Sequence, residues 1–173
     1  EVKKYVLPKF KITVDLDKPY YEPGQRVKAE IDAAYFFGKP VAGGQVRIEL
    51  ETTDVQPRIA GAFEAVTDKD GHAEVQFSLP PSFVGSSRDS GDARFQLLTT
   101  VTDTAGQKQT ATTSRVVTNK PLRVEVVPES GRLVRDVPNV VYLMARYADG
   151  RPAQARIAVA GSSEELQTSA LGL

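Results

Sequence analysis

The side chains best suited to chemistry lie in one short segment around residue 70. His72 is the single histidine, and it directly follows Asp68, Lys69, Asp70 and Gly71. An imidazole beside two carboxylates could act as a general base or hold a metal ion. A lone histidine without a preset cluster of partners supplies neither a catalytic pair nor a complete ligand set. We therefore expect His72 to be a solvated turn residue.

The same segment contains part of the pattern of a calcium-binding loop. In such a loop, alternate carboxylates supply hard oxygen ligands, and a glutamate completes the set near its end. Leu79 stands where that glutamate would be needed. An Asp-Gly pair between two runs of alternating apolar residues is instead typical of a tight β-hairpin turn. We expect a hairpin here, with no metal bound.

Nucleophilic catalysis has no support in the rest of the chain. Ser86, Ser87 and Ser90 lie near Arg88 and Asp89, but no histidine is placed to deprotonate a hydroxyl. The chain contains no cysteine, which excludes thiolate nucleophiles, thiolate metal ligands and disulfides. We expect no enzymatic activity, no catalytic residue and no cofactor.

Charge and hydropathy limit the classes of partner. Lys and Arg together number 22, as do Asp and Glu, so the formal net charge is zero. A protein that binds nucleic acid would normally carry a positive patch, and none stands out along the chain. No stretch approaches the roughly 18 consecutive apolar residues of a membrane-spanning helix. We expect neither nucleic-acid binding nor direct membrane insertion.

Alternation with a period of two recurs along the sequence, and this pattern predicts an all-β protein. Phe10, Ile12 and Val14, for example, alternate with Lys11 and Thr13. Turn signals such as Gly38-Lys39-Pro40 separate the alternating runs. We predict strands at residues 10–16, 27–35, 46–50, 72–79, 95–101 and 110–117. This spacing of short strands is typical of a seven-stranded sandwich.

The most informative feature is an internal repeat, found when residues 10–42 are laid over residues 122–154 without a gap. Apolar positions coincide along both predicted strands. The turn Gly38-Lys39-Pro40 falls on Gly150-Arg151-Pro152, where glycine permits a positive φ and proline stiffens the exit. The repeat predicts a second domain that begins like the first.

The repeat divides the chain into four parts. Residues 1–7 are interpreted as the end of a preceding domain or a linker, and residues 8–117 as one β-sandwich. Residues 118–121 form a short linker, and residues 122–173 a partial second sandwich. Half a sandwich cannot bury both faces of its sheets, so we expect the chain to be a piece of a longer protein.

Three ordered segments resemble the alpha-2-macroglobulin and complement thioester protein family. Residues 1–10 (Glu-Val-Lys-Lys-Tyr-Val-Leu-Pro-Lys-Phe) resemble the stretch that joins its second and third macroglobulin-like domains. Residues 19–25 (Pro-Tyr-Tyr-Glu-Pro-Gly-Gln) and 34–43 (Ala-Tyr-Phe-Phe-Gly-Lys-Pro-Val-Ala-Gly) resemble the next two landmarks of the third domain, in the same order. Residues 122–160 resemble the opening of the fourth.

The resemblance implies a fold and a role. The fold is a fibronectin type III-like macroglobulin-domain β-sandwich of seven strands, followed by a partial second one. In the family, such domains form a scaffold around a bait region and a thioester domain, and cleavage of the bait leads to trapping of the protease. The thioester motif Cys-Gly-Glu-Gln is absent here. The implied partners are other domains of the same parent chain, and proteases through the full-length parent.

Two segments are candidate contact surfaces. Val140, Tyr142 and Met144 occupy the outward-facing positions that Lys28, Glu30 and Asp32 hold in the first repeat. Apolar residues on both faces of a strand indicate burial by a neighbouring domain, or else a partner site.

The second segment is residues 80–92, a long polar loop that we expect to be flexible. It contains Phe83, Arg88 and Asp89, and a partner could contact it.

Two functional hypotheses remain open. The first is a non-catalytic scaffold module of a large alpha-2-macroglobulin-like protease inhibitor that acts in defence, and the alternative is a fibronectin-like module of a bacterial adhesin or receptor. Both predict a secreted, periplasmic or cell-surface protein, and the lack of cysteine favours a bacterial source. The three ordered landmarks favour the scaffold, because a generic adhesin module would match only the sandwich pattern.

Overall fold

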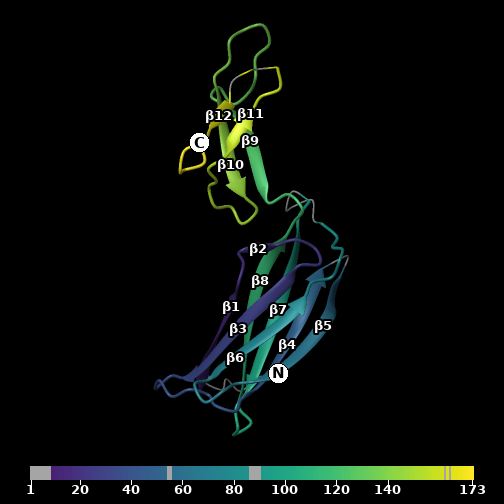
Figure 1. The fold of residues 1–173 in the computed structure, drawn as a ribbon, viewed down its shortest axis with the longest axis vertical. Helices are drawn as coiled ribbons and strands as arrows, with labels where there is room; N and C mark the ends of the chain where they lie inside the picture. The colour runs from purple at the N-terminus through teal and green to yellow at the C-terminus, as the bar shows by residue number, and fades with distance from the viewer. Residues whose placement is uncertain (1–8, 54–55, 86–90, 162, 164) are drawn as a thin grey trace, which may run out of the picture. The chain divides into compact units, whose positions relative to one another are not determined.

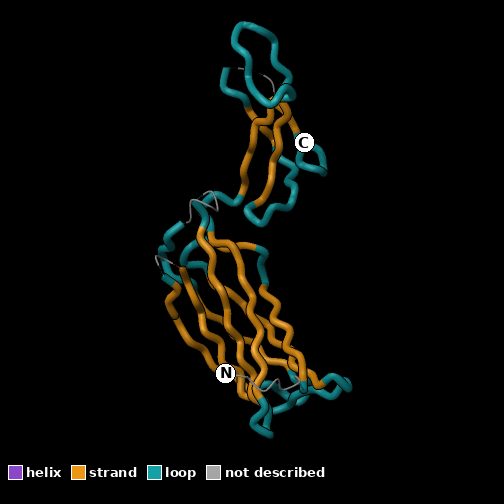
Figure 2. The backbone as a smooth tube through the Cα atoms, turned by 180° about the vertical axis from the view of Figure 1, so that it is seen from behind, coloured by secondary structure: helices purple, strands orange, loops and turns teal. Residues whose placement is uncertain are grey.

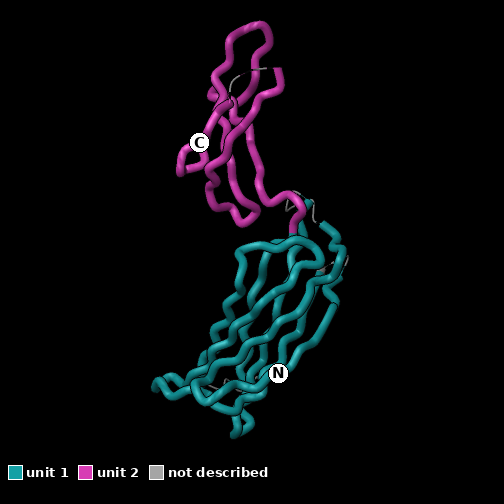
Figure 3. Tube along the Cα trace, viewed as in Figure 1, with its two compact units in different colours: residues 1–117 teal, residues 118–173 magenta. Residues whose placement is uncertain are grey.

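The computed structural model describes residues 9–53, 56–85, 91–161, 163 and 165–173. In this part of the chain the regular elements are all β-strands (Figure 2), which confirms the predicted all-β fold class. The described residues contain no helix that could cross a membrane. The chain divides into two compact units, residues 1–117 and 118–173 (Figure 3).

The first unit is a sandwich of two sheets (Figure 1). Its described strands are β1 (Phe10–Leu16), β2 (Tyr20–Tyr21), β3 (Arg26–Tyr35), β4 (Gln45–Thr53), β5 (Pro57–Val66), β6 (His72–Ser78), β7 (Ala93–Thr102) and β8 (Lys108–Val117). One sheet has the order β1-β3-β6, and the other β2-β8-β7-β4-β5. All neighbouring strands are antiparallel except the short pair β2 and β8.

The core lies between the two sheets because each strand turns every second side chain inward. On β3 the pattern alternates strictly, with Val27, Ala29 and Ile31 fully buried between partly exposed charged residues. The facing sheet contributes Ile48 and Leu97 in the same way. The period-two pattern in the sequence is therefore the pattern of this core.

Strand β5 is the long strand that the sequence pattern did not predict. Its residues Pro57–Val66 include small side chains that give little alternation. The pairing register also shifts, since Leu50 lies opposite Gly61 whereas Glu51 lies opposite Ile59. Ala60 is thus the extra residue of a β-bulge, and a bulge breaks the period on which the prediction depends.

A compact joint connects the two sheets where the chain crosses between them. The backbone N–H of Ala33 donates to the carbonyl oxygen of Gly71 (2.9 Å), and the N–H of Val41 donates to that of Ala33 (2.9 Å). The buried Thr67 hydroxyl donates to the carbonyl of Val41 and accepts the N–H of Gly44 (2.8 Å). We call these five residues the joint. They tie β3 and β6 to the start of β4 and the end of β5.

The second unit contains two described strand pairs. Strand β9 (Leu122–Pro128) pairs with β10 (Val141–Tyr147), and β11 (Arg156–Ala158) pairs with β12 (Glu165–Gln167). Strand β9 begins and ends at the residues that the repeat aligns with the ends of β1. The four strands correspond in order and pairing to β1, β3, β4 and β5.

The joint is also repeated. The N–H of Ala145 donates to the carbonyl of Gly172 (2.7 Å), and the N–H of Ala153 to that of Ala145 (2.9 Å). The Thr168 hydroxyl donates to the carbonyl of Ala153 and accepts the N–H of Ala155, both at 2.8 Å. Gly172 has a φ of 79°, matching the 78° of Gly71. The two units therefore share one local design.

The units differ in how far their inner faces are covered. Leu122, which corresponds to the 1% exposed Phe10, is 45% exposed, and Val126 is 58% exposed. Among the described residues β10 pairs only with β9, whereas β3 pairs with β1 and β6. The described part of the second unit therefore presents one open sheet edge and one open apolar face.

The joint predicts a large effect of substitution at Gly71. A β-carbon there would collide with the carbonyl oxygen of Ala33, and φ is left-handed. Gly71→Ala should lower the free energy of unfolding by about 2–4 kcal/mol in urea titrations. Gly106→Ala is the matched control, because φ is 77° and the space is open. It should cost only about 1 kcal/mol, and equal losses in both variants would contradict the role of the joint.

The open edge predicts a difference in hydrogen exchange. Val140 accepts a backbone bond from Glu129 on the β9 side, so by alternation the backbone N–H groups of Val141 and Leu143 face the open edge. In the 173-residue chain they should exchange much faster than those of Ala29 and Ile31, which β6 covers. Amide exchange followed by NMR would reveal this, and comparable protection would show that β10 is covered.

Candidate functional site

The turn between β5 and β6 places the candidate residues of the 68–72 segment. The predicted hairpin is wrong, because β5 and β6 belong to different sheets and the turn carries the chain from one sheet to the other. The Asp68 carboxylate accepts the backbone N–H of Asp70 (2.8 Å) and of His72 (3.0 Å). The bond from the His72 N–H, and then that from Asp70, hold the pKa of Asp68 below its ordinary value. One oxygen of the Asp68 carboxylate is therefore engaged in stabilising the turn.

His72 pairs across the sheet with Asp32 on β3. The two residues lie directly opposite each other, with 3.1 Å between the imidazole Nδ1 and the carboxylate Oδ1. The hydrogen bond to Asp32 is the main cause that raises the pKa of His72, and desolvation opposes it. No group of three or more His, Cys, Asp or Glu side chains in the described ranges could hold a metal ion. The arrangement is an exposed ion pair on the outer face of a sheet.

The predicted flexible loop is described only in part. Phe83 is partly buried and packs against the core. Arg88 and Asp89, like Ser86, Ser87 and Ser90, lie outside the described residues. A partner contact at this loop stays a prediction.

The outer face of β9 and β10 carries an apolar strip. Tyr142 lies opposite Val127, and Met144 lies opposite Glu125. Val140 continues the face and is 58% exposed, while Tyr142 is 48% exposed. We call Val127, Val140, Tyr142 and Met144 the outer strip. It lies on the opposite face from Leu122, Val124 and Val126, so an open core does not account for it.

The corresponding face of the first unit is charged. The Lys28 ammonium pairs with Glu30 at 2.7 Å and with Glu74 at 3.1 Å, and Asp32 pairs with His72. Exposed ion pairs of this kind contribute little stability and keep a surface solvated. The pairs β1–β3 and β9–β10 share one backbone pattern, so the difference between the two faces lies in the side chains. An exposed apolar strip is typical of a surface that contacts another protein surface.

The rim of the outer strip is polar. Arg146 and Glu125 form an ion pair across the hairpin, and the Tyr142 hydroxyl donates to Glu129 at 3.4 Å. An apolar centre with a polar rim is the usual anatomy of a protein interface. The sequence prediction identified Val140, Tyr142 and Met144, and whether they form a contact stays a prediction. It missed Val127, whose position on the same face required the β9–β10 register.

The His72–Asp32 pair predicts a pH dependence. Because the folded pKa of His72 is raised above its ordinary value of 6.5, the stabilisation is fully present below that pH. It is lost as the pH rises through the folded pKa. Asp32→Asn should shift the His72 titration, followed by NMR, towards its ordinary value. Asp70→Asn, in the same turn, should leave it unchanged, and an equal effect of both variants would contradict the pairing.

Comparisons with known proteins agree with this architecture. The profile of the macroglobulin domain MG3 matches residues 4–105. An alpha-2-macroglobulin of Ralstonia nicotianae is 34% identical over 84 residues, which covers 42% of this chain and 5% of that protein. The chain thus spans a small part of the length of this relative.

Solved structures show the same fold. The native conformation of Escherichia coli alpha-2-macroglobulin matches with a TM-score of 0.60 at 12% identity, over 88% of this chain and 12% of that chain. Salmonella alpha-2-macroglobulin reacted with methylamine matches with a TM-score of 0.59 at 13% identity, over 89% and 12%. Taken with the profile match over most of the sandwich, these findings place the chain in the alpha-2-macroglobulin family, as a macroglobulin MG3 domain with the residues that follow it.

Proposed function

We propose that this chain is a non-catalytic structural module of a larger alpha-2-macroglobulin-like protease inhibitor. The observation that carries the proposal is the match of the MG3 profile to residues 4–105, the segment that contains strands β1 to β7 of the sandwich. The described residues offer ion pairs and packing surfaces, and the His72 pair is solvated. Cleavage of a bait region and capture of the protease would take place in other parts of the parent chain.

The role of the first unit would be mechanical. Its core is closed between two sheets, and the joint fixes where the chain crosses from one sheet to the other. Such a unit moves as a rigid body, because close-packed interiors transmit strain and do not deform continuously. A rigid sandwich can hold neighbouring domains in place and pass on their displacement when a bait region is cut.

The second unit would be part of another macroglobulin-like sandwich. Its four strands repeat β1, β3, β4 and β5, and its joint repeats that of the first unit. The exposed side chains of Leu122, Val124 and Val126 are the counterparts of core residues. In the parent protein, strands equivalent to β6, β7 and β8 would cover this face.

The outer strip would contact another domain of the same parent chain. It combines exposed valine and tyrosine side chains with a charged rim, while Lys28, Glu30 and Asp32 occupy the corresponding positions of β3 in the first unit. Burying Val140 and Tyr142 would gain about 25 cal/mol for each Å² of apolar surface removed from water. We also propose that the parent is secreted, periplasmic or exposed at the cell surface, since a protease inhibitor of this type meets its targets there.

The first experiment tests the inhibitor role on the parent protein. It should be incubated with a protease and then assayed with a large protein substrate and a small peptide substrate. A trapped protease should lose activity on the large substrate and keep it on the small one, while the 173-residue chain alone should affect neither. Full activity on both substrates with the parent would refute the proposal and favour an adhesin or receptor.

The second experiment tests the outer strip. Val140→Lys together with Tyr142→Glu copies the residues of the first unit at these positions. In the parent protein this pair should reduce trapping about tenfold or more, because an apolar contact of at least about 1.4 kcal/mol is lost. In the 173-residue chain it should change the unfolding free energy by no more than about 0.5 kcal/mol.

The matched control is Val159→Lys with Ala160→Glu, at exposed positions outside the strip. This control should leave trapping unchanged. A parent that tolerates both pairs equally would show that the outer strip makes no interdomain contact.

A further inference from the structure

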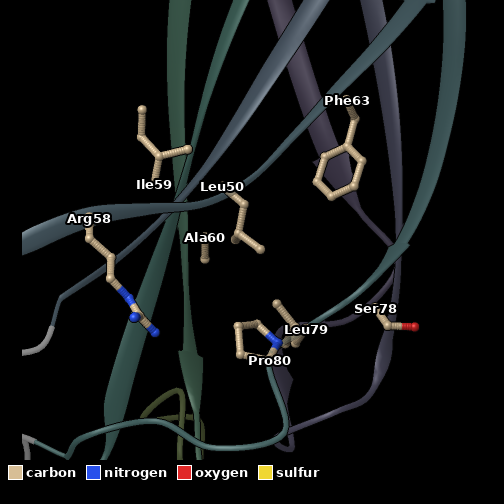
Figure 4. A pocket seen from close by; sticks show the side chains of 8 residues that line it. All are labelled: Leu50, Arg58, Ile59, Ala60, Phe63, Ser78, Leu79 and Pro80. Atoms are coloured by element: carbon tan, nitrogen blue, oxygen red, sulfur yellow. The ribbon is translucent and has the colours of Figure 1, made fainter.

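The two sheets of the first unit separate at one edge, between β5 and β6. A cavity of about 410 Å³ opens there, with Leu50 and Phe63 from the β4–β5 side and Leu79 from the end of β6 (Figure 4). All of its lining residues belong to the described part of the chain. The cavity is separate from the His72 pair and from the outer strip.

Apolar side chains form part of the cavity lining, while polar atoms contribute the larger share of its exposed surface. Leu50 and Leu79 are 1% and 3% exposed, so the cavity reaches the hydrophobic core itself. Phe63 stacks on Phe77 with 4.5 Å between ring centroids, which fixes the position of one wall. A ligand group in contact with these side chains would have to be apolar.

Arg58 provides the charge at the mouth. It pairs in register with Thr52, an inward-facing residue that is 7% exposed, so it lies on the core-facing side of β5. Figure 4 shows its side chain on one side of the cavity, across Leu50 and Ala60 from Phe63. Within the described residues, no hydrogen bond or ion pair holds the guanidinium. Among the residues that the structure describes, this inward-facing arginine therefore has no counter-charge.

The local backbone determines how a ligand could enter. A β-bulge and an inward charge are both devices that discourage another strand from adding to a sheet edge. Ala60 supplies the bulge and Arg58 the charge, so β5 is a poor template for an extended peptide. A compact ligand that enters between the sheets does not have to pair with this edge.

We propose that this cavity binds a small monocarboxylate with an apolar tail. The carboxylate pairs with the Arg58 guanidinium, whose planar fork matches two carboxylate oxygens. The tail lies on Leu50, Phe63 and Leu79. The volume lies within the range of roughly 300–1,000 Å³ typical of small-molecule sites. This activity would be independent of protease trapping.

The test uses the 173-residue chain and octanoate as the probe, followed by 1H–15N NMR. Octanoate should shift the amides of Arg58, Ile59, Ala60 and Leu79 in a saturable manner. Octanol has a similar tail without the charge, and it should bind about tenfold more weakly or worse, since it cannot form a charge-assisted hydrogen bond with the guanidinium. Shifts of equal size with both probes would refute a carboxylate site.

Substitutions separate the charge from the fold. Arg58→Gln should weaken octanoate binding about tenfold or more, and Arg58→Lys should restore part of it. Arg156→Gln, at an exposed arginine on β11 in the second unit, is the matched control and should bind octanoate like the unchanged chain. Circular dichroism would establish that each variant is folded.

Three results would overturn the proposal. They are octanoate shifts spread over the exposed apolar residues of the second unit, equal affinity in the Arg58→Gln variant, and no saturable shift at all. Any of them would leave Arg58 as a device that protects the sheet edge.

Discussion

Both sheets of the first unit depend on the joint at which the chain crosses between them. Ala33 binds Gly71 through its N–H and Val41 through its carbonyl, so one residue of β3 fixes the entry to β4 and the approach to β6. The Thr67 hydroxyl holds the exit of β5 against the start of β4. A slip of one residue in either strand would turn its apolar face outward. The joint therefore sets which side chains enter the core.

The second unit shows that this joint forms from local sequence. The same bonds recur at Ala145, Gly172, Ala153, Ala155 and Thr168, although the inner face beside them is open. Each such bond contributes only about 0.5–1.5 kcal/mol net, so the joint alone cannot stabilise a domain. Burial of the inner face must supply most of the stability. The joint defines the arrangement, and covering strands would make it stable.

The sequence alone predicted the fold where its period was intact. Alternation located β1, β3, β6, β7 and β8, and Gly38 and Gly150 adopt the positive φ expected of their turns. It failed at β5, because the bulge at Ala60 interrupts the period and small residues weaken it. The cavity beside Arg58 was missed for a different reason. Its two sides are far apart in the sequence, and only the pairing of β4 with β5 shows that Arg58 faces inward.

Three of the four residues of the outer strip, all except Val127, could be found from the sequence by comparing the two copies of the repeat. Lys28 and Glu30 in the first copy correspond to Val140 and Tyr142 in the second. The strands have the same backbone pattern, but one outer surface is charged and the other is apolar. Stability of the hairpin does not explain the difference, since exposed ion pairs and exposed valines both contribute little to it.

The two candidate surfaces therefore have a common origin. Each lies where the chain departs from the rule of charged outside and apolar inside. Val140 and Tyr142 stand where the first unit has charged residues, and Arg58 lies on the core-facing side of β5. An exposed apolar patch or an inward-facing charge is unfavourable unless another molecule or domain contacts it. In a chain for which we propose a non-catalytic role, such departures are the strongest physical indication of where it makes contact.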